Sequence, residues 1–517
     1  MKNKCLICKL LLLWLLPGIL FSQQPYTIDA SITHQTIANF GASDAWTTQF
    51  FGHFPDERRN QMADWLFSME TDAAGQPKGI GLSLWRFKIG AGSASQGAES
   101  FIPDIKRRAE SFQLPDGTYD WSRHSGQQWF LQAAKERGVE RFLAFSKSPP
   151  IHMTINGLAN NRGRPSDGTV NLRPDQFEAF ADFLATVVDE LGRRNGITFQ
   201  YLSPFNEPEW DWSGRTTQEG TPALMSEIAD LVRILDRKLS ERVLNTQILV
   251  TESGQIDFLI REYRLPGRAN QIETFFSPAS PNYIGNLTHV PRKMVAHSYW
   301  TTTRNQLYPL RRALRNRLDE FGLDFWQTEL CIMSNDYEIG GGWGRDLTMK
   351  TALYVARIIH HDLTVANASA WHWWLAMTGY DYKDGLVYVI ANNDLTDGEI
   401  MYSKLMWTLG NFSRFVRPGA KRVEVSNAYR NVNDLDGLMV SAFIHDEDKQ
   451  LVIVAINYSD EPQDIDFQFK NTTVNSFIPF ITSDTEGDNL RPGNPHPANE
   501  TFQIPARAVV TFVGNVL

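Results

Sequence analysis

Two glutamates stand at the ends of apolar runs that read as strands of one domain. Glu207 lies in the sequence Ser-Pro-Phe-Asn-Glu-Pro at the end of one run, and Glu329 closes another, Phe325–Glu329. In that second run Phe325, Gln327 and Glu329 share one face by the two-residue period of a strand. Two carboxyl groups across one site suit the cleavage of a glycosidic bond, because one protonates the leaving oxygen while the other attacks or activates water. The structural alternatives are a surface Glu207 before a proline turn and a solvent-facing Glu329.

The elements that must position this pair alternate regularly along the chain. Between residues 36 and 375, eight short apolar runs are separated by segments with room for a helix, of which Pro174–Arg193 has the clearest helical spacing. The eight runs are Ile37–Gly41, Leu82–Ile89, Arg141–Ser146, Phe199–Phe205, Ile248–Thr251, Met294–Tyr299, Phe325–Glu329 and Ala368–Trp373. This pattern predicts an α/β fold, a (β/α)₈ TIM barrel over residues 36–410, and a doubly wound sheet is the alternative. Active sites of such barrels lie at the carboxyl ends of the strands, so glutamates ending strands four and seven would meet at the mouth.

The last hundred residues have a different texture. Strand-like runs separated by turn-rich pieces follow one another with no helical period; the runs are Gly437–His445, Gln450–Tyr458, Asp464–Phe469, Val474–Ile481 and Thr501–Val513. We predict an all-β sandwich over residues 411–517 and expect the N-terminal segment 23–35 to add a strand to it. No tryptophan follows Trp407, so we expect the sandwich to support the barrel and not to bind sugar.

The first 22 residues read as a secretory signal peptide. Three lysines precede the apolar run Leu10–Phe21, which is too short to span a bilayer, and Ser22 is a small residue suited to cleavage. A lipoprotein anchor is the weaker interpretation, because Cys5 and Cys8 precede the apolar run instead of closing it. We therefore expect a secreted or periplasmic protein in which Cys331 is the one remaining cysteine and forms no intramolecular disulfide.

Composition bounds the remaining classes of function. The chain has 517 residues, of which 42% are hydrophobic and 21% charged, so it can bury a sizeable core. It carries 50 basic and 59 acidic residues, and this balance argues against nucleic acid as a partner. No stretch after the signal reaches the length of a membrane span, and we expect a monomer.

Several residues near the predicted mouth have types that suit a sugar site. Asn206, one residue before Glu207, has an amide that can donate to a sugar 2-hydroxyl; an asparagine that caps its own turn is the alternative. His297 and Tyr299 share a face at the end of the sixth strand, where Tyr299 would hold Glu329 ionised; two core residues are the alternative. Arg86 inside a strand is costly to bury unless a carboxylate pairs with it.

Aromatic and acidic residues extend this set. Trp371 and Trp373 point to one side of the eighth strand, and we expect one of them to form a sugar platform while Trp374 packs on or past the strand end. Asp44 and Trp46 at the end of the first strand are candidates for outer hydroxyl contacts. Glu252 ends the fifth strand as a third carboxylate, and we assign it no catalytic role.

Other motifs do not support a cofactor or a metal. Gly90-Ala91-Gly92 lacks the third glycine of a dinucleotide loop, and the Gly-Gly-Gly-Trp-Gly sequence at 340–344 lacks the lysine of a phosphate loop and reads as a flexible connection. His360 and His361 lie in a helical segment without a metal-site pattern.

These motifs together resemble a known family. Asn-Glu-Pro ending strand four and a glutamate ending strand seven are typical of the clan A glycoside hydrolases, and further motifs are similar to family 30 over almost the whole mature chain. Those motifs are Gly41-Ala42-Ser43-Asp44-Ala45-Trp46, Leu84-Trp85-Arg86-Phe87, Ser148-Pro149-Pro150 and the appended sandwich. The resemblance implies a retaining mechanism without metal or cofactor, with Glu207 as acid/base and Glu329 as nucleophile. It also implies that Arg86, Asn206, Tyr299 and Trp373 line the glycone subsite.

Within the family, the sequence around Asp44-Ala45-Trp46 and Ile80-Gly81-Leu82-Ser83 is most similar to the endo-β-1,6-galactanases. Ser93 stands where glucosylceramide-cleaving members have an aspartate, and Ile151-His152-Met153 replaces an expected tryptophan, which argues against glucosylceramide. We expect a secreted endo-β-1,6-galactanase acting on a polysaccharide. The alternatives are a β-1,6-glucanase, a glucuronoxylanase, or a barrel that binds carbohydrate without turning it over.

Overall fold

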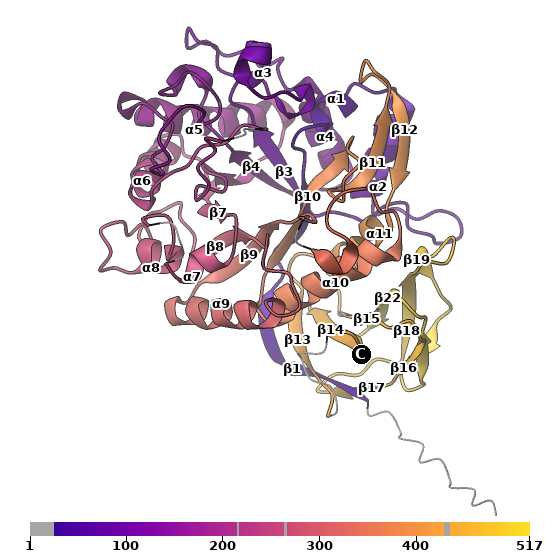
Figure 1. Ribbon diagram of the computed structural model, residues 1–517. Helices are drawn as coiled ribbons and strands as arrows, with labels where there is room; N and C mark the ends of the chain where they lie inside the picture. The colour runs from indigo at the N-terminus through magenta and orange to yellow at the C-terminus, as the bar shows by residue number, and fades with distance from the viewer. Residues whose placement is uncertain (1–24, 215–216, 263–265, 335, 429–434) are drawn as a thin grey trace, which may run out of the picture.

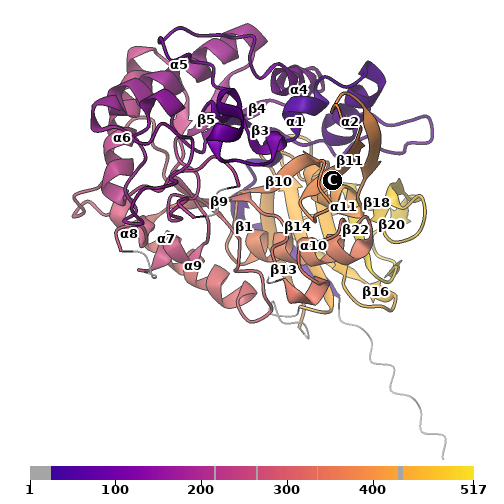
Figure 2. The same ribbon diagram turned by 45° about the horizontal axis from the view of Figure 1, so that its top comes forward.

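The computed structural model describes residues 25–214, 217–262, 266–334, 336–428 and 435–517 (Figure 1). The predicted signal peptide, residues 1–22, lies outside these ranges. A helix-covered barrel forms the larger part of the molecule, and the strands of the C-terminal sandwich lie along one side of it (Figures 1 and 2). The predicted fold class, a (β/α)₈-type barrel with a β-sandwich, is confirmed.

The barrel sheet is parallel throughout its closed path. Its strands are β2 (Asn39–Ser43), β3 (Leu84–Ile89), β4 (Arg141–Ser146), β5 (Phe199–Ser203), β6 (Gln247–Ile248), β7 (Thr251–Ser253), β8 (Lys293–His297), β9 (Asp324–Glu329) and β10 (Ala370–Thr378). They pair in the order β6-β5-β4-β3-β2-β10-β9-β8-β7. Only two residues separate β6 from β7, so the ends of this path are two pieces of one strand. The cylinder therefore closes with eight strand positions, the fifth of which is broken.

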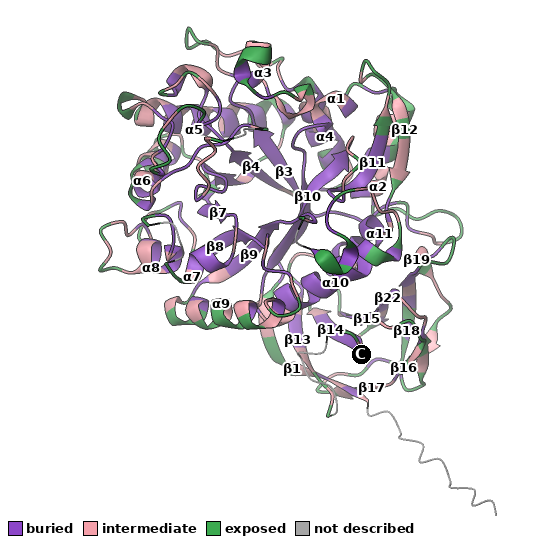
Figure 3. Cartoon of the chain, in the orientation of Figure 1, coloured by how far each residue is buried: buried purple, intermediate pink, exposed green. Residues whose placement is uncertain are grey.

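Helices surround the barrel because their apolar faces match the outer side of the strands. They are α1 (Thr48–Phe51), α2 (Asp56–Phe67), α3 (Ser93–Gln96), α4 (Ser125–Glu136), α5 (Phe177–Asn195), α6 (Met225–Glu241), α7 (Asp257–Ile260), α8 (Gln271–Phe276), α9 (Leu307–Phe321) and α10 (Met349–Thr364). In α5 the buried residues Phe180, Leu184, Val187 and Leu191 recur at helical spacing. The strands themselves are almost wholly buried (Figure 3).

The barrel interior is apolar at the bottom and polar at the top. A separate cluster of inward residues closes the bottom; its fully or nearly buried members are Leu84, Leu143, Tyr201, Leu249, Val295, Trp326 and Ala370. Side chains alternate along a strand, so Arg86, two residues after Leu84 on β3, also points inward and lies nearer the mouth. The apolar layer thus forms a floor beneath the polar groups.

An unforeseen hairpin follows the last barrel strand. β11 (Gly385–Ala391) pairs in parallel with the end of β10 and antiparallel with β12 (Gly398–Tyr402). Helix α11 (Lys404–Ser413) comes next and runs across the boundary predicted between residues 410 and 411. The first sandwich strand after it is β13 (Lys421–Ser426).

The sandwich combines the C-terminal strands with one strand from the other end of the chain. Its main path is β17-β1-β13-β14-β15-β22-β18-β19, in which β1 (Tyr26–Thr36) lies between β13 and β17. The remaining bounds are β14 (Leu438–His445), β15 (Gln450–Asn457), β16 (Gln463–Ile465), β17 (Phe467–Lys470), β18 (Ser476–Thr482), β19 (Asn489–Pro492), β20 (His496–Pro497), β21 (Phe502–Ile504) and β22 (Ala508–Asn515).

The central sandwich strands have two apolar faces. On β15, Leu451, Ile453 and Ala455 belong to the core of the sandwich, whereas Val452, Val454 and Ile456 belong to the core of the barrel. Helices α10 and α11 supply the barrel side of this second contact. The sheet is therefore shared between the two cores.

None of the helices in the described ranges combines the length and the apolar character needed to cross a bilayer.

Candidate active site

Glu207 and Glu329 meet at the mouth of the barrel. Glu207 follows β5 in a left-handed conformation (φ 49°), and its backbone N–H donates to the carbonyl oxygen of Glu252 at 2.8 Å. Glu329 is the last residue of β9. One carboxylate oxygen of each glutamate and one ring nitrogen of His297 all lie within 4.8 Å of one another, and all three residues are buried. The predicted pair is thus brought together.

Glu329 reaches the mouth for a different reason from the one that the sequence indicated. Trp326 and Thr328 of β9 face inward, whereas Phe325 packs in the outer core. The pairing of β8 with β9 shifts register between Ala296 and His297, so that His297 lies opposite Glu329. The expectation that Phe325 and Glu329 share a face is therefore wrong, because this irregularity breaks the alternation at the end of the strand.

Three donors surround the carboxylate of Glu329. Arg86 Nη1 donates to Oε2 at 2.6 Å, Tyr299 OH donates to Oε1 at 2.9 Å, and His297 Nδ1 lies 3.6 Å from Oε1. Burial alone would raise the pKa of Glu329, but the positive charges of His297, Arg86 and Lys147 outweigh it and hold the pKa below its ordinary value. Glu329 is therefore ionised at neutral pH.

His297 bridges the carboxyl groups of Glu207 and Glu252. Its Nδ1 lies 3.0 Å from Glu207 Oε1 and its Nε2 lies 3.1 Å from Glu252 Oε2. Burial alone would lower the pKa of His297, but the charge of Glu329 and the hydrogen bonds to Glu207 and Glu252 raise the pKa to about 9. The ring is thus an imidazolium that donates from both nitrogens.

Glu252, to which we assigned no catalytic role from the sequence, lies buried beneath the site and binds its charged side chains. It accepts hydrogen bonds from Ser203 Oγ and Thr328 Oγ1 at 2.6 Å each, and from Arg86 Nη2 at 3.1 Å. Burial would raise the pKa of Glu252, but the charges of Arg86 and His297 and these hydrogen bonds lower it strongly. This buried anion fixes the orientation of Arg86 and of His297.

Asn206 is oriented by Arg86. Its Oδ1 accepts from Arg86 Nη2 at 3.1 Å, whereas its buried Nδ2 has no hydrogen-bond partner among the described residues. The amide is therefore a free donor beside Glu207, and the turn-capping alternative does not describe its contacts.

Asp44 and Trp46 lie at the same end of the barrel, but they differ in environment. Asp44 is wholly buried; Lys88 N donates to its Oδ1 at 2.7 Å, and burial raises its pKa to about 8. Trp46 lies at the rim, with its ring 5.2 Å from that of Trp374 and 4.1 Å from the guanidinium carbon of Arg107.

Comparison with known proteins identifies the family. The model of O-glycosyl hydrolase family 30 matches residues 23–388, well over half of the chain. The chain belongs to glycoside hydrolase family 30. The beta sandwich domain of the same family matches residues 419–512, and the predicted resemblance is confirmed.

Several relatives are similar to this family 30 chain over most of its length. An endo-beta-1,6-galactanase from Hypocrea rufa is 26% identical over 423 residues, 77% of each chain. Glucuronoxylanase XynC from Bacillus subtilis is 24% identical over 351 residues, 66% of this chain and 67% of the relative. The crystal structure of a conserved exported protein from Bacteroides fragilis has a TM-score of 0.88 at 33% identity, with 95% of this chain and 100% of that chain covered.

Trp373 was predicted to line the site of this family 30 barrel, but the structure places Trp374 there. Trp373 is fully buried on the outer side of β10, where its Nε1 donates to the carbonyl oxygen of Asp384 at 2.8 Å and its ring stacks on Trp371. Ala370 faces the barrel interior, so the alternation directs His372 and Trp374 inward. Because β10 continues to Thr378, Trp374 lies within the strand and presents its ring to Trp46.

Lys147 is a member of the site that the sequence did not reveal. It directly follows β4, is almost completely buried, and donates from Nζ to Gln218 Oε1 at 2.8 Å. The same Nζ lies 4.2 Å from the ring centroid of Trp374. Burial lowers the pKa of Lys147 to about 8, although the charges of Glu329 and Glu207 oppose this shift. The lysine therefore adds a titratable cation beside the carboxylate pair.

The ligand atoms of Glu207, His297 and Glu329 are also close enough together to hold a metal ion. These atoms are engaged already, since His297 Nδ1 faces Glu207 and Tyr299 donates to Glu329. The nearby charges of Arg86 and of protonated His297 would repel a divalent cation. The donor set does not fit a metal centre.

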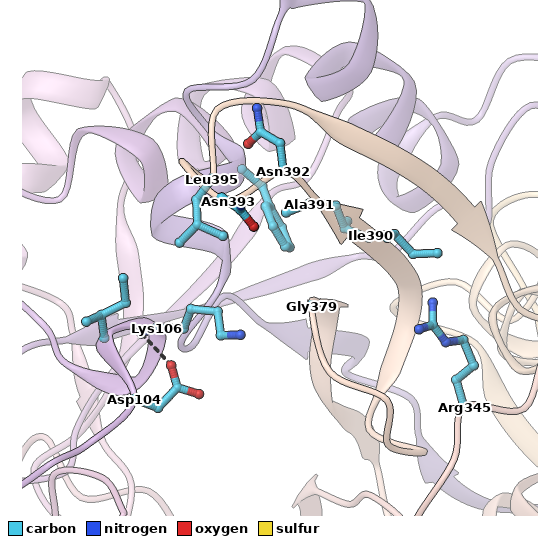
Figure 4. A pocket seen from close by; sticks show the side chains of 12 residues that line it. Asp104, Lys106, Arg345, Gly379, Ile390, Ala391, Asn392, Asn393 and Leu395 are labelled. Atoms are coloured by element: carbon cyan, nitrogen blue, oxygen red, sulfur yellow. Dashed lines mark hydrogen bonds between the residues drawn. The ribbon is translucent and has the colours of Figure 1, made fainter.

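A second hollow lies beside the mouth, against the end of β11 and the turn of the β11–β12 hairpin. It has a volume of about 370 Å³, and Lys106 and Arg345 stand on either side of Gly379 (Figure 4). Its lining comes from the segments that follow β2, β3, β9 and β10, among them the end of β11 and the hairpin turn, so it lies at the carboxyl ends of the barrel strands, as the active site does. The rim of this family 30 barrel is therefore indented next to the mouth.

Proposed function

We propose that the chain is a retaining β-glycoside hydrolase that cleaves β-1,6-linked galactan side chains, with Glu329 as nucleophile and Glu207 as acid/base. The observation that carries the mechanism is the separation of the pair, because one oxygen of each carboxylate lies within 4.8 Å of the other. Retaining enzymes have carboxyl groups about 5–5.5 Å apart, whereas inverting enzymes need about 6.5–9.5 Å to admit a water molecule.

The first step makes a glycosyl-enzyme. Glu329, ionised among Arg86, Tyr299 and His297, attacks the anomeric carbon while Glu207 gives its proton to the departing glycosidic oxygen. One C–O bond forms as another breaks, and the negative charge of Glu329 is consumed in the ester. The free Nδ2 of Asn206 donates to the sugar 2-hydroxyl beside the reacting carbon.

The second step consumes water. Glu207, now a carboxylate, takes a proton from a water molecule as the water oxygen attacks the anomeric carbon, and Glu329 leaves as a carboxylate. His297 hydrogen-bonds Glu207 and is fixed on its other side by Glu252, so it holds the acid/base in place through both steps.

The choice of substrate is supported by the similarity to the endo-beta-1,6-galactanase of Hypocrea rufa. A reducing-sugar assay on β-1,6-galactan, β-1,6-glucan and glucuronoxylan tests it. Preferential release from galactan with a β-configured first product by proton NMR is the expected result. Preference for another polymer would reassign the substrate. An α-configured first product would overturn the retaining mechanism. Binding of a polymer without release of sugar would indicate a barrel that binds carbohydrate but does not cleave it.

We further propose that residues 1–22 are cleaved as a signal peptide and that the mature protein is an exported monomer. The lysines and apolar run at the N-terminus support this proposal. N-terminal sequencing of the natively expressed protein should begin at or near Gln23, and size-exclusion chromatography with light scattering should give a single-chain mass.

A further inference from the structure

The connection between β9 and α10 presents an exposed tryptophan on the catalytic face. Trp343 is 78% exposed, whereas Trp46 and Trp374 inside the mouth are 8% and 3% exposed. Leaving so large an apolar ring in water is unfavourable, and a ligand that packs on the indole would remove part of that surface from water. The mechanism proposed above makes no use of this residue.

The loop that carries Trp343 is fastened on the side facing the barrel. Lys383 Nζ donates to the carbonyl oxygens of Gly341 and Trp343 at 2.9 Å each, and Lys383 N donates to Gly342 O at 2.7 Å. Trp343 also forms a backbone bridge with Tyr382, and the two rings meet edge to face at 5.4 Å. The orientation of the indole is thus fixed before any ligand arrives.

The glycines around Trp343 are required by this path. Gly340, Gly341 and Gly344 have φ values of 83°, 70° and 76°, in the region that favours glycine. A Cβ at Gly342 would lie 2.1 Å from Cζ of Tyr382. The Gly-Gly-Gly-Trp-Gly sequence therefore forms a closely packed loop that holds the side chain of Trp343. The predicted flexible connection does not agree with these contacts.

This support is directly linked to the active site. Glu329 ends the strand from which the connection starts, and Ile332 N donates to Lys383 O at 3.2 Å, so the start of the connection is fixed to the same segment that holds Trp343. Cys331 lies 3.7 Å from the hydroxyl of Tyr299, which donates to Glu329. Trp343 therefore stands on the nucleophile's side of the rim.

We propose that Trp343 is an aromatic platform that binds one sugar unit of the polymeric substrate outside the catalytic subsite. A pyranose ring presents a face of C–H groups that packs against an indole, and the edge-to-face contact with Tyr382 leaves a face of the indole free. The inference rests on the proposed function, in that it requires a substrate longer than the unit being cleaved.

The test compares Trp343→Ala with Tyr337→Ala, a change of another highly exposed aromatic residue in the same connection. Rates are measured on β-1,6-galactan and on its oligosaccharides of increasing length. Trp343→Ala should raise KM for the polymer about five- to tenfold, the contribution of one aromatic contact, with kcat unchanged. The shortest cleaved oligosaccharide and the Tyr337→Ala variant should show no change, and Trp343→Tyr should restore part of the loss.

An equal effect on substrates of every length, or no effect on the polymer, would overturn the platform. If the wild-type enzyme prefers β-1,6-glucan or glucuronoxylan, the same length series is made from that polymer. If it cleaves none of the three, the proposed function fails, and affinity electrophoresis in gels containing each polymer still decides the inference. Trp343→Ala should then lose the retardation that Tyr337→Ala keeps, and equal mobility of the two variants would refute it.

Discussion

Nδ1 of His297 lies 3.0 Å from Oε1 of Glu207, while the opposite nitrogen of the same ring is held by the buried carboxylate of Glu252. The acid/base is therefore bonded to a cation whose position is set from below. Arg86 and Tyr299 bind the carboxylate of Glu329 directly, whereas His297 hydrogen-bonds Glu207 and supports the charge of Glu329 from 3.6 Å.

Removing the imidazolium should cost both stability and activity. The pKa of His297 is raised from 6.5 to about 9 in the folded protein, so its stabilising contribution is complete below about pH 6.5 and is lost as pH rises through about 9. His297→Gln leaves buried carboxylates without their cation and should lower the free energy of unfolding at pH 7 by about 3 kcal/mol. Denaturant unfolding at pH 6, 7 and 9.5 measures this, with His496→Gln in the sandwich as control. A loss that is as large at pH 9.5 as at pH 6 would contradict the assignment.

The two glutamates should fail in different ways. Glu329→Gln removes the nucleophile and should reduce kcat by at least about 10⁴-fold on every substrate. Glu207→Gln should lose much less with an aryl glycoside whose leaving group needs no proton, and added azide should restore turnover by forming a β-glycosyl azide. Steady-state rates and product NMR distinguish the variants. Rescue of Glu329→Gln as the β-azide, with none for Glu207→Gln, would reverse the roles.

Lys147 should set the alkaline limit of activity. Burial lowers its pKa to about 8, so above that pH the site loses a cation that supports the ionised form of Glu329. Lys147→Met should lower kcat/KM at pH 7 about tenfold, a loss equivalent to one pKa unit of support for Glu329, and should remove the fall in rate near pH 8.

The stability of the same variant should change in the opposite direction. Burial lowers the pKa of this lysine from 10.5 to about 8, which makes folding less favourable; the penalty is fully present below about pH 8 and is lost as pH rises from about 8 to about 10.5. Lys147→Met should therefore match or exceed the wild type in free energy of unfolding at pH 7. Lys106→Met, on the neighbouring rim, is the control for both measurements. If Lys147→Met is less stable than the wild type and its rate still falls near pH 8, Lys147 does not set the alkaline limit of activity.

The barrel should not survive alone. Val452, Val454 and Ile456 of the sandwich belong to the barrel core, and Asn411 Nδ2 donates to Thr511 Oγ1 at 3.0 Å across the junction. A chain truncated after residue 410 would lose these side chains, expose the apolar residues of α10 that they cover, and should be insoluble. Val454→Ala in the full chain should lower the melting temperature by several degrees. Expression trials and calorimetry test both points. A soluble, fully active truncated barrel would show that the sandwich gives no support.

The periodicity of the strands was sufficient to predict the barrel and the inward direction of some of its polar residues. Arg86 follows Leu84 by two positions and does point inward beside a carboxylate, as its cost of burial required. The phase of β10 was not predictable in the same way, because its true end at Thr378 lies beyond the run that the sequence suggested. Trp373 was therefore expected at the site and Trp374 as a packing residue on or past the strand end, whereas it is Trp374 whose ring contacts Trp46 and Lys147.

Other parts of the site depend on contacts between distant segments. Lys147 carries no local signal, since its burial comes from Trp374, 227 positions later in the chain. Glu252 was visible as a carboxylate at a strand, but its contacts with both Arg86 and His297 exist only once the closed barrel turns β3, β7 and β8 toward one interior. Side-chain partners brought together by barrel closure cannot be found from spacing along one strand.

The position of β1 affects the order in which the molecule can be completed. Thr27 pairs with Ser426, and Tyr26 pairs with Phe467, so the earliest described strand finds both neighbours only after most of the polypeptide has been made. Until then its backbone amides and carbonyls remain an open edge that another extended chain can add to. Contacts of such large sequence separation form slowly, because a long loop must close first. The pairing of β1 with β13 and β17 is thus a late step of assembly, and a chain interrupted before residue 421 would leave that edge permanently unpaired.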